Sequence, residues 1–167
     1  MDLQLSDELA QKRAALHRRL RELSPCFVAF SGGVDSTLLL HEAHEALGDD
    51  VVAVTIETPY THQWELAEAR SFIARWGITH QVVSLPVPEA VRENPEDRCY
   101  RCKKILFSTL CDIARDRGGV VLDGTNADDR PEERPGMAAL SELGVASPLR
   151  EAGFTKQDIR ALSKLLD

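Results

Sequence analysis

The sequence predicts an α/β protein built on an open, mostly parallel five-stranded sheet with helices on both faces. Short, mostly apolar runs alternate along the chain with segments of helical periodicity, which is the pattern of repeated βαβ units. The chain has 167 residues, a length typical of one domain with an ordinary buried core. Gly and Pro are too few for a low-complexity chain. We therefore expect a single domain over residues 1–167.

The elements of this fold can be placed from the residue pattern. An amphipathic helix is expected over residues 1–24, where leucines recur at helical spacing and basic residues occupy the solvated face. The expected strands are Cys26–Phe30, Val51–Ile56, Thr79–Leu85, Val120–Asp123 and Val145–Leu149. Two apolar stripes predict further helices, at Leu66, Ala69, Ile73 and Trp76 and at Cys102, Leu106, Leu110 and Ile113. The loops at Ser31, Glu57 and Gly124 should share one rim, because ligands bind beyond the carboxyl ends of parallel strands.

Charge and hydropathy argue against two classes of partner. The net charge is −7, so the overall field gives no help in binding a phosphate backbone, which argues against nucleic acid. The longest apolar runs have about five residues, far short of the ~20 that a transmembrane helix needs. The first residues lack the charged and apolar regions of a secretory signal, so we expect a cytoplasmic protein.

A glycine-rich loop directly after the first expected strand gives the strongest functional signal. It consists of Ser31, Gly32, Gly33, Val34, Asp35, Ser36 and Thr37. Two adjacent glycines let the backbone approach a ligand closely, and the helix that follows offers unpaired N–H groups at the positive end of its dipole. The hydroxyls add donors, and Asp35 beside a polyphosphate is explained as a ligand of Mg²⁺. The loop therefore predicts an anion site, although it matches neither a Walker loop nor a dinucleotide fingerprint.

Ser-Gly-Gly-Val-Asp-Ser closely resembles the pyrophosphatase loop of the ATP pyrophosphatase (PP-loop) superfamily. This resemblance implies a Rossmann-like fold of the adenine nucleotide alpha hydrolase type, with ATP and Mg²⁺ as cofactors. It also implies that ATP is cleaved between the α and β phosphates, so that a substrate oxygen is adenylated and pyrophosphate is released. The superfamily places adenine against the end of the second strand, which here carries Thr55 and Ile56, where backbone groups would read the base.

Three further segments resemble one branch of the superfamily, the LarE-type sulfur transferases of nickel-pincer nucleotide synthesis. They are residues 94–104, residues 123–129, and residues 134–137 leading to 147–153. With the loop, they cover nearly the whole chain. The resemblance implies a small-molecule substrate, a carboxylate on a pyridinium mononucleotide, and leaves a homo-oligomer open. Proteins of this type carry a further C-terminal region with a sulfur-donating cysteine, which we expect to be absent after residues 162–167.

Candidate site residues also follow the fourth strand. Gly124 and Thr125 belong on the ligand rim, and Asp129 is the preferred partner of Asp35 as a Mg²⁺ ligand. Asp128 and Asp129 are open to another interpretation, as an acidic pair at a helix N-terminus. A second open alternative makes Asp123 a buried carboxylate that backbone amides satisfy.

Cationic residues complete the expected site. Candidates for binding phosphate or a substrate carboxylate are Arg98, Lys103, Arg134 and Arg150. Of these, Lys103 is assigned with Asp35 and Ser36 to catalysis, and Arg150 to nucleotide binding.

The four cysteines do not form a metal pattern. Cys99 and Cys102 have no second pair at metal spacing, which argues against a closed zinc site. They are open to interpretation as reactive thiols or persulfide carriers near a helix start, although packing is the favoured role for Cys102. Cys26 and Cys111 are interpreted as packing residues.

Other function classes remain open alongside adenylation for sulfur transfer. One is an ammonia-dependent amidating synthetase of the same superfamily, similar to NAD or GMP synthetase. Another is a non-catalytic module that senses adenine nucleotides. Thiolation of RNA is a further alternative, which the acidic charge weakens.

Overall fold

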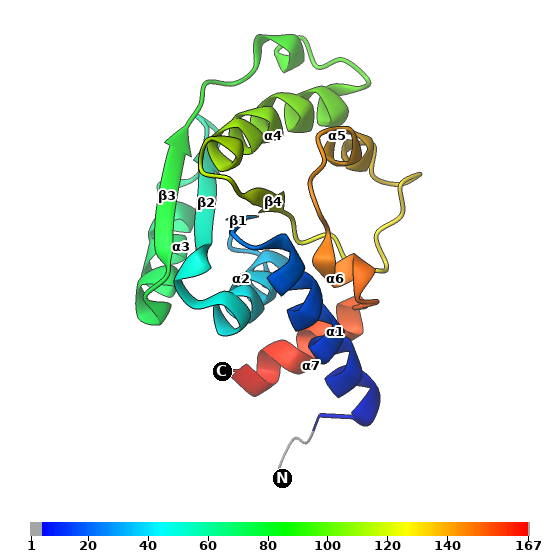
Figure 1. Cartoon of the computed structure of the whole chain (residues 1–167). Helices are drawn as coiled ribbons and strands as arrows, with labels where there is room; N and C mark the ends of the chain where they lie inside the picture. The colour runs from blue at the N-terminus through cyan, green and yellow to red at the C-terminus, as the bar shows by residue number, and fades with distance from the viewer. Residues whose placement is uncertain (1–4, 167) are drawn as a thin grey trace.

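The computed structural model describes residues 5–166 and contains a four-stranded, fully parallel sheet (Figure 1). The strands are β1 (Cys26–Ala29), β2 (Val51–Glu57), β3 (Thr79–Ser84) and β4 (Val120–Leu122), in the order β3-β2-β1-β4. Each strand ends within one residue of its predicted end. At the centre of the sheet, Phe27 pairs with Val52 on one side and Val121 on the other. The predicted α/β class and parallel sheet are confirmed.

The predicted fifth strand is wrong, because the segment over 145–149 makes only a single parallel bridge between Ala146 and Leu122. Ala146 donates its N–H to Val121 and accepts from Asp123, both at 3.0 Å. The following Pro148 has no N–H to continue a ladder and instead occupies the first turn of a short helix. The chain therefore turns away from the sheet edge after one bridge.

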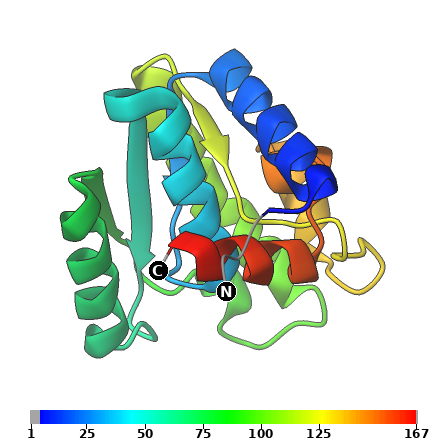
Figure 2. The same cartoon turned by 90° about the horizontal axis from the view of Figure 1, so that it is seen from below.

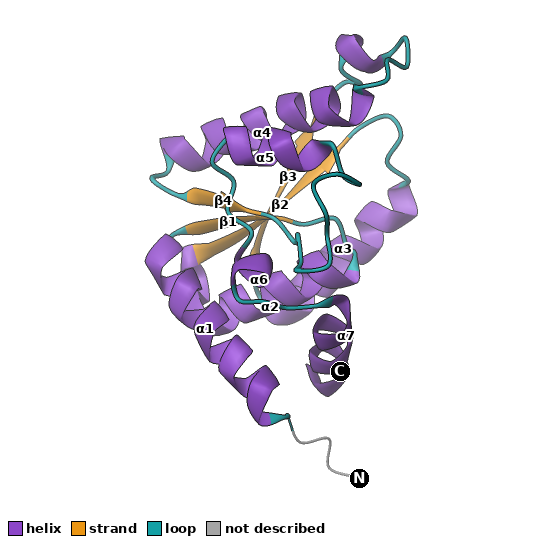
Figure 3. Ribbon diagram, turned by 90° about the vertical axis from the view of Figure 1, so that its right-hand side faces the viewer, coloured by secondary structure: helices purple, strands orange, loops and turns teal. Residues whose placement is uncertain are grey.

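Helices cover both faces of the sheet, as predicted (Figure 3). The helices are α1 (Asp7–Leu23), α2 (Val34–Leu47), α3 (Gln63–Trp76), α4 (Arg98–Asp116), α5 (Gly136–Glu142), α6 (Pro148–Glu151) and α7 (Lys156–Leu166), with 3-10 turns at Gly48–Asp50 and Glu89–Val91. One face carries α1, α2, α3 and α7, and the other carries α4 and α5 (Figures 2 and 3). None of the helices described is long and apolar enough to cross a membrane.

Two apolar clusters, one on each face, hold these layers together. The larger one packs leucines of α1, α2 and α7 with Ala69 and Ile73 of α3, and the smaller one packs Phe27 and Val54 against Leu110 of α4. The helix expected over residues 1–24 is α1, and residues 1–4 lie outside the described residues. Its leucines at positions 9, 16 and 20 are buried, which confirms the amphipathic pattern. The expected boundary at residue 167 also lies outside the described residues.

A buried ionic cluster joins α1 to α2. The Glu42 side chain on α2 is fully buried, and its carboxylate accepts from Arg13 Nε at 2.7 Å and contacts His17 Nε2 at 2.5 Å, both from α1. His41 Nδ1 lies 3.3 Å from the other carboxylate oxygen. Burial opposes ionisation of Glu42, but hydrogen bonds from His41, Arg13 and His17 outweigh it and lower the pKa to about 2. The cluster therefore anchors α2, the helix that follows the glycine-rich loop.

Candidate active site

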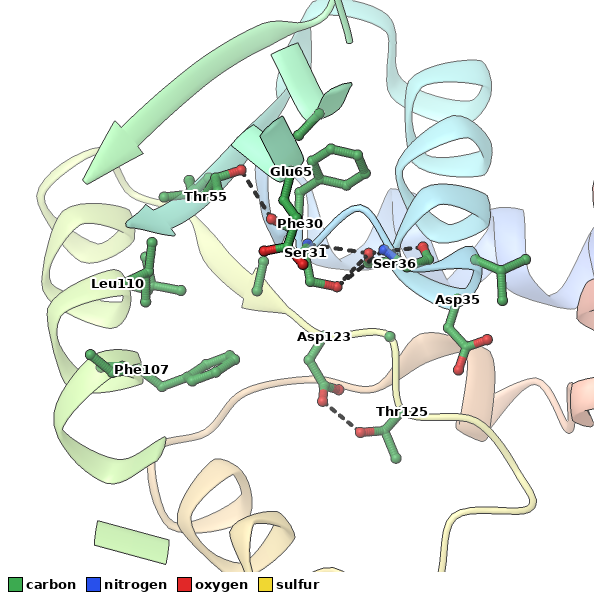
Figure 4. A pocket seen from close by; sticks show the side chains of 18 of the residues that line it. Phe30, Ser31, Asp35, Ser36, Thr55, Glu65, Phe107, Leu110, Asp123 and Thr125 are labelled. Atoms are coloured by element: carbon green, nitrogen blue, oxygen red, sulfur yellow. Dashed lines mark hydrogen bonds between the residues drawn. The ribbon is translucent and has the colours of Figure 1, made fainter. Parts of the chain in front are cut away.

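A cavity of about 490 Å³ lies at the carboxyl ends of β1, β2 and β4 (Figure 4). The loops after these strands share one rim of the sheet, as expected for the carboxyl ends of parallel strands. The cavity runs from the glycine-rich loop to an apolar wall on α4 that consists of Leu106, Phe107 and Leu110. Its predicted lining residues are Ser31, Gly33, Val34, Asp35, Ser36, Thr55, Ile56, Gly124 and Thr125. Most of the residues predicted for nucleotide binding are therefore brought together in one place.

Hydroxyl groups shape the glycine-rich loop from inside. Ser36 Oγ accepts from Ser31 N at 3.3 Å, donates to Gly33 O at 3.2 Å and lies 3.1 Å from Ser31 Oγ. Gly32 has φ +82°, a backbone conformation that residues other than glycine rarely adopt. Because Ser36 makes these internal contacts, it fixes the curve of the loop.

The N-terminus of α2 is open to a ligand. Gly33 is its N-cap residue, and no side chain among the described residues caps it. The first turn of the helix lines the cavity, and its amides have no side-chain cap at the positive end of the helix dipole. Gly124 lies close to this turn: a Cβ at position 124 would come within 3.0 Å of Ser36 N. The two loops thus form a narrow, amide-lined cradle that suits an anion.

Asp35, the second residue of α2, bonds to two polar side chains. Lys156 Nζ, from the start of α7, forms an ion pair with Asp35 Oδ1. Asn126 Nδ2 donates to Asp35 Oδ2 at 3.0 Å. Lys156 and Asn126 were not predicted as site residues, because their roles depend on the way that α7 and the loop after β4 pack against α2.

Asp129 lies beside this pair. Its Oδ2 accepts from the backbone N of Asn126 at 2.9 Å, and its Oδ1 accepts from Arg134 Nη1 at 2.7 Å. Asp35 and Asp129, the two predicted metal ligands, therefore both bond to Asn126. Asp128 lies in a turn and Asp129 directly follows it outside any helix, so the alternative that they start a helix is wrong. Asp128 instead accepts from the backbone N of Lys156 at 2.8 Å.

Asp123, the residue directly after β4, is a buried carboxylate. It accepts from Thr125 Oγ1 at 2.5 Å and from Ser147 Oγ at 2.6 Å. The alternative that Asp123 is a buried strand-end carboxylate is confirmed in its burial and wrong in its partners, because hydroxyl groups rather than backbone amides satisfy it.

The end of β2 offers a backbone edge to the cavity. Phe30 N donates to Val54 O at 2.9 Å, so the backbone groups of Val54 and of the alternate residue Ile56 face the β1 side. At the level of Ile56, β1 has already turned into the glycine-rich loop, and Thr55 Oγ1 donates to the Phe30 carbonyl at 3.0 Å. The amide edge of Ile56 therefore faces the cavity, where it can pair with the edge of a planar base.

His80 supports this arrangement from β3. Its Nε2 lies 2.8 Å from Thr55 Oγ1, and burial lowers the pKa of the imidazole, with a smaller contribution from Arg70. Since the Thr55 hydroxyl proton is used on Phe30 O, His80 acts as the donor to Thr55. The His80 ring also meets the Phe30 ring edge-on, at 6.4 Å between centroids.

Several predicted residues do not line the cavity. Lys103 on α4 packs its stem against Gly136, and its Nζ lies 5.7 Å from the centre of the Phe107 ring, which does line it. Arg150 is exposed on α6. Gly32 and Thr37 belong to the loop and the first turn of α2 but are not among the residues that line the cavity. Of the four cationic candidates, Arg134 lines the cavity.

The cysteines are all free thiols. Burial raises the pKa of Cys26 to about 12 and also raises the pKa values of Cys102 and Cys111. Cys99 is exposed at the start of α4. Among residues 5–166, no three His, Cys, Asp or Glu side chains are grouped as a metal site. Cys26 is buried and Cys111 is partly buried, which agrees with the packing roles predicted for them.

A match to a known sequence family shows where this chain belongs. A sequence model of the asparagine synthase family matches residues 9–129, a span that includes the glycine-rich loop and ends at Asp129. The chain belongs to the asparagine synthase family. This assignment confirms the predicted membership of the PP-loop superfamily.

Two relatives match most of this asparagine synthase family chain. It is 40% identical over 162 residues to the pyridinium-3,5-bisthiocarboxylic acid mononucleotide synthase of Lactiplantibacillus plantarum, across 95% of this chain and 59% of that protein. It is also 40% identical over 163 residues to an uncharacterized protein of Synechocystis sp., across 95% of this chain and 60% of that protein. The chain thus spans about 60% of the length of these relatives.

The fold is shared with solved structures. An NH3-dependent NAD synthetase from Campylobacter jejuni matches with a TM-score of 0.67 at 20% identity, over 99% of this chain and 74% of that one. This likeness confirms the Rossmann-like architecture with helices on both faces of a parallel sheet.

Proposed function

We propose that this protein adenylates a carboxylate of a pyridinium mononucleotide with ATP, releasing pyrophosphate and preparing the carboxyl carbon for sulfur transfer. The observation that carries the proposal is the uncapped start of α2 at one end of the cavity, together with Asp35 and its ion-pair partner Lys156. The other end offers the backbone edge of Ile56 and an apolar wall. One adenine nucleotide can therefore use both ends of the cavity at once.

The pyrophosphate portion of ATP would bind at the loop of residues 31–37. The amides of the first α2 turn donate to phosphate oxygens, and the loop curve set by Ser36 brings them close. Lys156 and Arg134 add two cations on the side of the loop after β4. Charge that develops on the departing pyrophosphate is thus met by fixed donors, an effect that contributes strongly to catalysis.

The residues present also fit a magnesium ion. Asp35 and Asp129 supply carboxylate oxygens, the ligands that Mg²⁺ prefers, and one or two such groups suffice when phosphates complete the shell. Both carboxylates bond to Asn126, and each also pairs with a cation. When bound, the ion would neutralise charge on the phosphates. Lys156 and Arg134 would then turn from the carboxylates toward phosphate oxygens.

The name of the Lactiplantibacillus plantarum relative supports the choice of substrate. A thiocarboxylic acid forms from a carboxylic acid when sulfur replaces one oxygen, and a carboxylate oxygen leaves only after activation. Attack of that oxygen on the α phosphorus of ATP breaks the bond to the bridging oxygen, pyrophosphate departs, and an acyl-adenylate remains. Attack by a sulfur nucleophile on the acyl carbon then releases AMP.

Product analysis tests the proposal. The protein, ATP and Mg²⁺ are incubated with sulfide and a pyridinium-3,5-dicarboxylic acid mononucleotide, and nucleotides are separated by chromatography. We expect AMP and pyrophosphate in equal amounts, stimulated by the mononucleotide, and no release by Asp35→Ala. Tyr100→Phe, which removes only an exposed hydrogen bond to Glu142, is the matched control and should retain activity. ADP with phosphate as products, or normal release by Asp35→Ala, would contradict the proposal.

A further inference from the structure

Asn126 is hydrogen-bonded to three acidic residues of the candidate site. It is buried, with 3% of its surface exposed, in the loop that follows β4. Its Nδ2 donates to Asp35 Oδ2 at 3.0 Å, its backbone N donates to Asp129 Oδ2 at 2.9 Å, and its Oδ1 accepts from Asp128 N at 2.9 Å. One residue therefore connects the glycine-rich loop and α2 to the loop after β4.

The orientation of this amide is determined by its neighbours. The backbone N–H of Asp128 can only donate, and the carboxylate of Asp35 accepts. A flipped amide would face a donor with a donor and a carboxylate with an oxygen, so the N and O positions follow from chemistry. The side chain is thus fixed at both ends, with its donor aimed at Asp35.

The other partners of the two carboxylates are cations. Lys156 holds Asp35, and Arg134 holds Asp129. Both are long, partly exposed side chains, and a divalent cation between the carboxylates would compete with them for the same oxygens. Asn126 is neutral, so it does not compete and can keep its bonds when a metal ion arrives. Asn126 can therefore hold the carboxylates both before and after a metal ion binds.

We propose that Asn126 is a positioning residue that ties the Asp35 carboxylate to the loop carrying Asp129, so that both can serve one divalent cation. This inference rests on the metal site of the proposed function and adds the residue that preorganises it. The general rule is that groups which orient a metal's ligands act on affinity, and their loss typically costs about 10- to 100-fold in metal binding.

Asn126→Ser separates the two roles of this side chain. A serine hydroxyl can still accept from the N–H two residues on, as in an ST turn, so the turn to Asp128 is retained. The backbone bond to Asp129 is also retained, and only the reach to Asp35 is lost. Asn126→Thr offers the same hydroxyl and replaces the serine variant if that one does not fold. Asn94→Ser, the same change in an exposed loop, is the control.

The assay is direct Mn²⁺ binding, followed by electron paramagnetic resonance, with the protein bound to α,β-methylene-ATP. We expect the dissociation constant of Mn²⁺ to rise at least about tenfold in Asn126→Ser and to stay unchanged in Asn94→Ser. The Mg²⁺ concentration for half-maximal AMP release should rise by a similar factor, while the rate at saturating Mg²⁺ changes little.

Unchanged Mn²⁺ affinity in a folded Asn126 variant would overturn the inference and leave the proposed function standing. A wild-type complex that binds no Mn²⁺ would overturn the metal site and this inference together. A fall in the rate at saturating Mg²⁺ with unchanged metal affinity would assign Asn126 to another role and also overturn the inference.

Discussion

Glu42→Gln tests the ionic cluster that anchors α2 beneath the glycine-rich loop. The Glu42 carboxylate is fully buried, and its folded-state pKa of about 2 lies below the ordinary value of 4.5. That difference corresponds to about 3 kcal/mol of folding free energy at neutral pH. Glutamine has the size of the protonated acid, so Glu42→Gln should lower the free energy of unfolding by about this amount at pH 7.

The stabilisation by Glu42 depends on pH in one direction. Because the folded-state pKa is lowered, the stabilisation by Glu42 is complete above pH 4.5 and is lost as the pH falls toward 2. Urea unfolding of wild type and Glu42→Gln at pH 7, 5, 4 and 3 should therefore show a difference that shrinks as the pH falls. Glu45→Gln, at an exposed site one turn away, should change stability by less than about 0.5 kcal/mol. A difference that is constant with pH would show that ionisation of Glu42 does not stabilise the fold.

Three further predictions follow from the site. Lys156→Met should weaken ATP binding at least about tenfold because a phosphate-facing cation is lost; unchanged binding by calorimetry would contradict its assigned role. Gly124→Ala should also weaken ATP binding about tenfold with little change in melting temperature, because the new Cβ would lie 3.0 Å from Ser36 N and push the cradle open; equal affinity would show that the loops can separate freely. Iodoacetamide at pH 7.5 should label Cys99 before Cys102, since Cys99 is exposed and burial raises the pKa of Cys102; peptide mass spectrometry would reveal the reverse order.

The fold was predictable because local patterns and global packing agree in most of the chain. The β1 run at Cys26–Ala29 and the helix that starts at Val34 have apolar residues at the periods of buried strands and helices. The predicted strand over 145–149 was wrong because an apolar run of this length does not reveal whether the chain stays beside the sheet. Pro148 was the available signal, since it favours the first turn of a helix.

The candidate site was predictable where one motif carries it. The glycine-rich loop placed Ser31, Asp35 and Ser36 at the cavity, and the strand-end rule placed Gly124 there. Lys156 and Asn126 could not be found this way, because their importance comes from contacts with Asp35, which is remote in sequence. A lysine at the start of a helix and an asparagine in a polar loop are each ordinary until the packing of α7 and β4 is known.

Transfer of an oxygen isotope shows directly whether the protein adenylates the carboxylate. The mononucleotide is prepared with ¹⁸O in both carboxylate groups and incubated with the protein, ATP, Mg²⁺ and sulfide, and the AMP formed is examined by mass spectrometry. If the carboxylate oxygen attacks the α phosphorus, one ¹⁸O atom leaves with AMP when the acyl carbon is attacked. We expect AMP that carries one ¹⁸O; unlabelled AMP, or ADP with labelled phosphate, would show that the carboxylate is not adenylated.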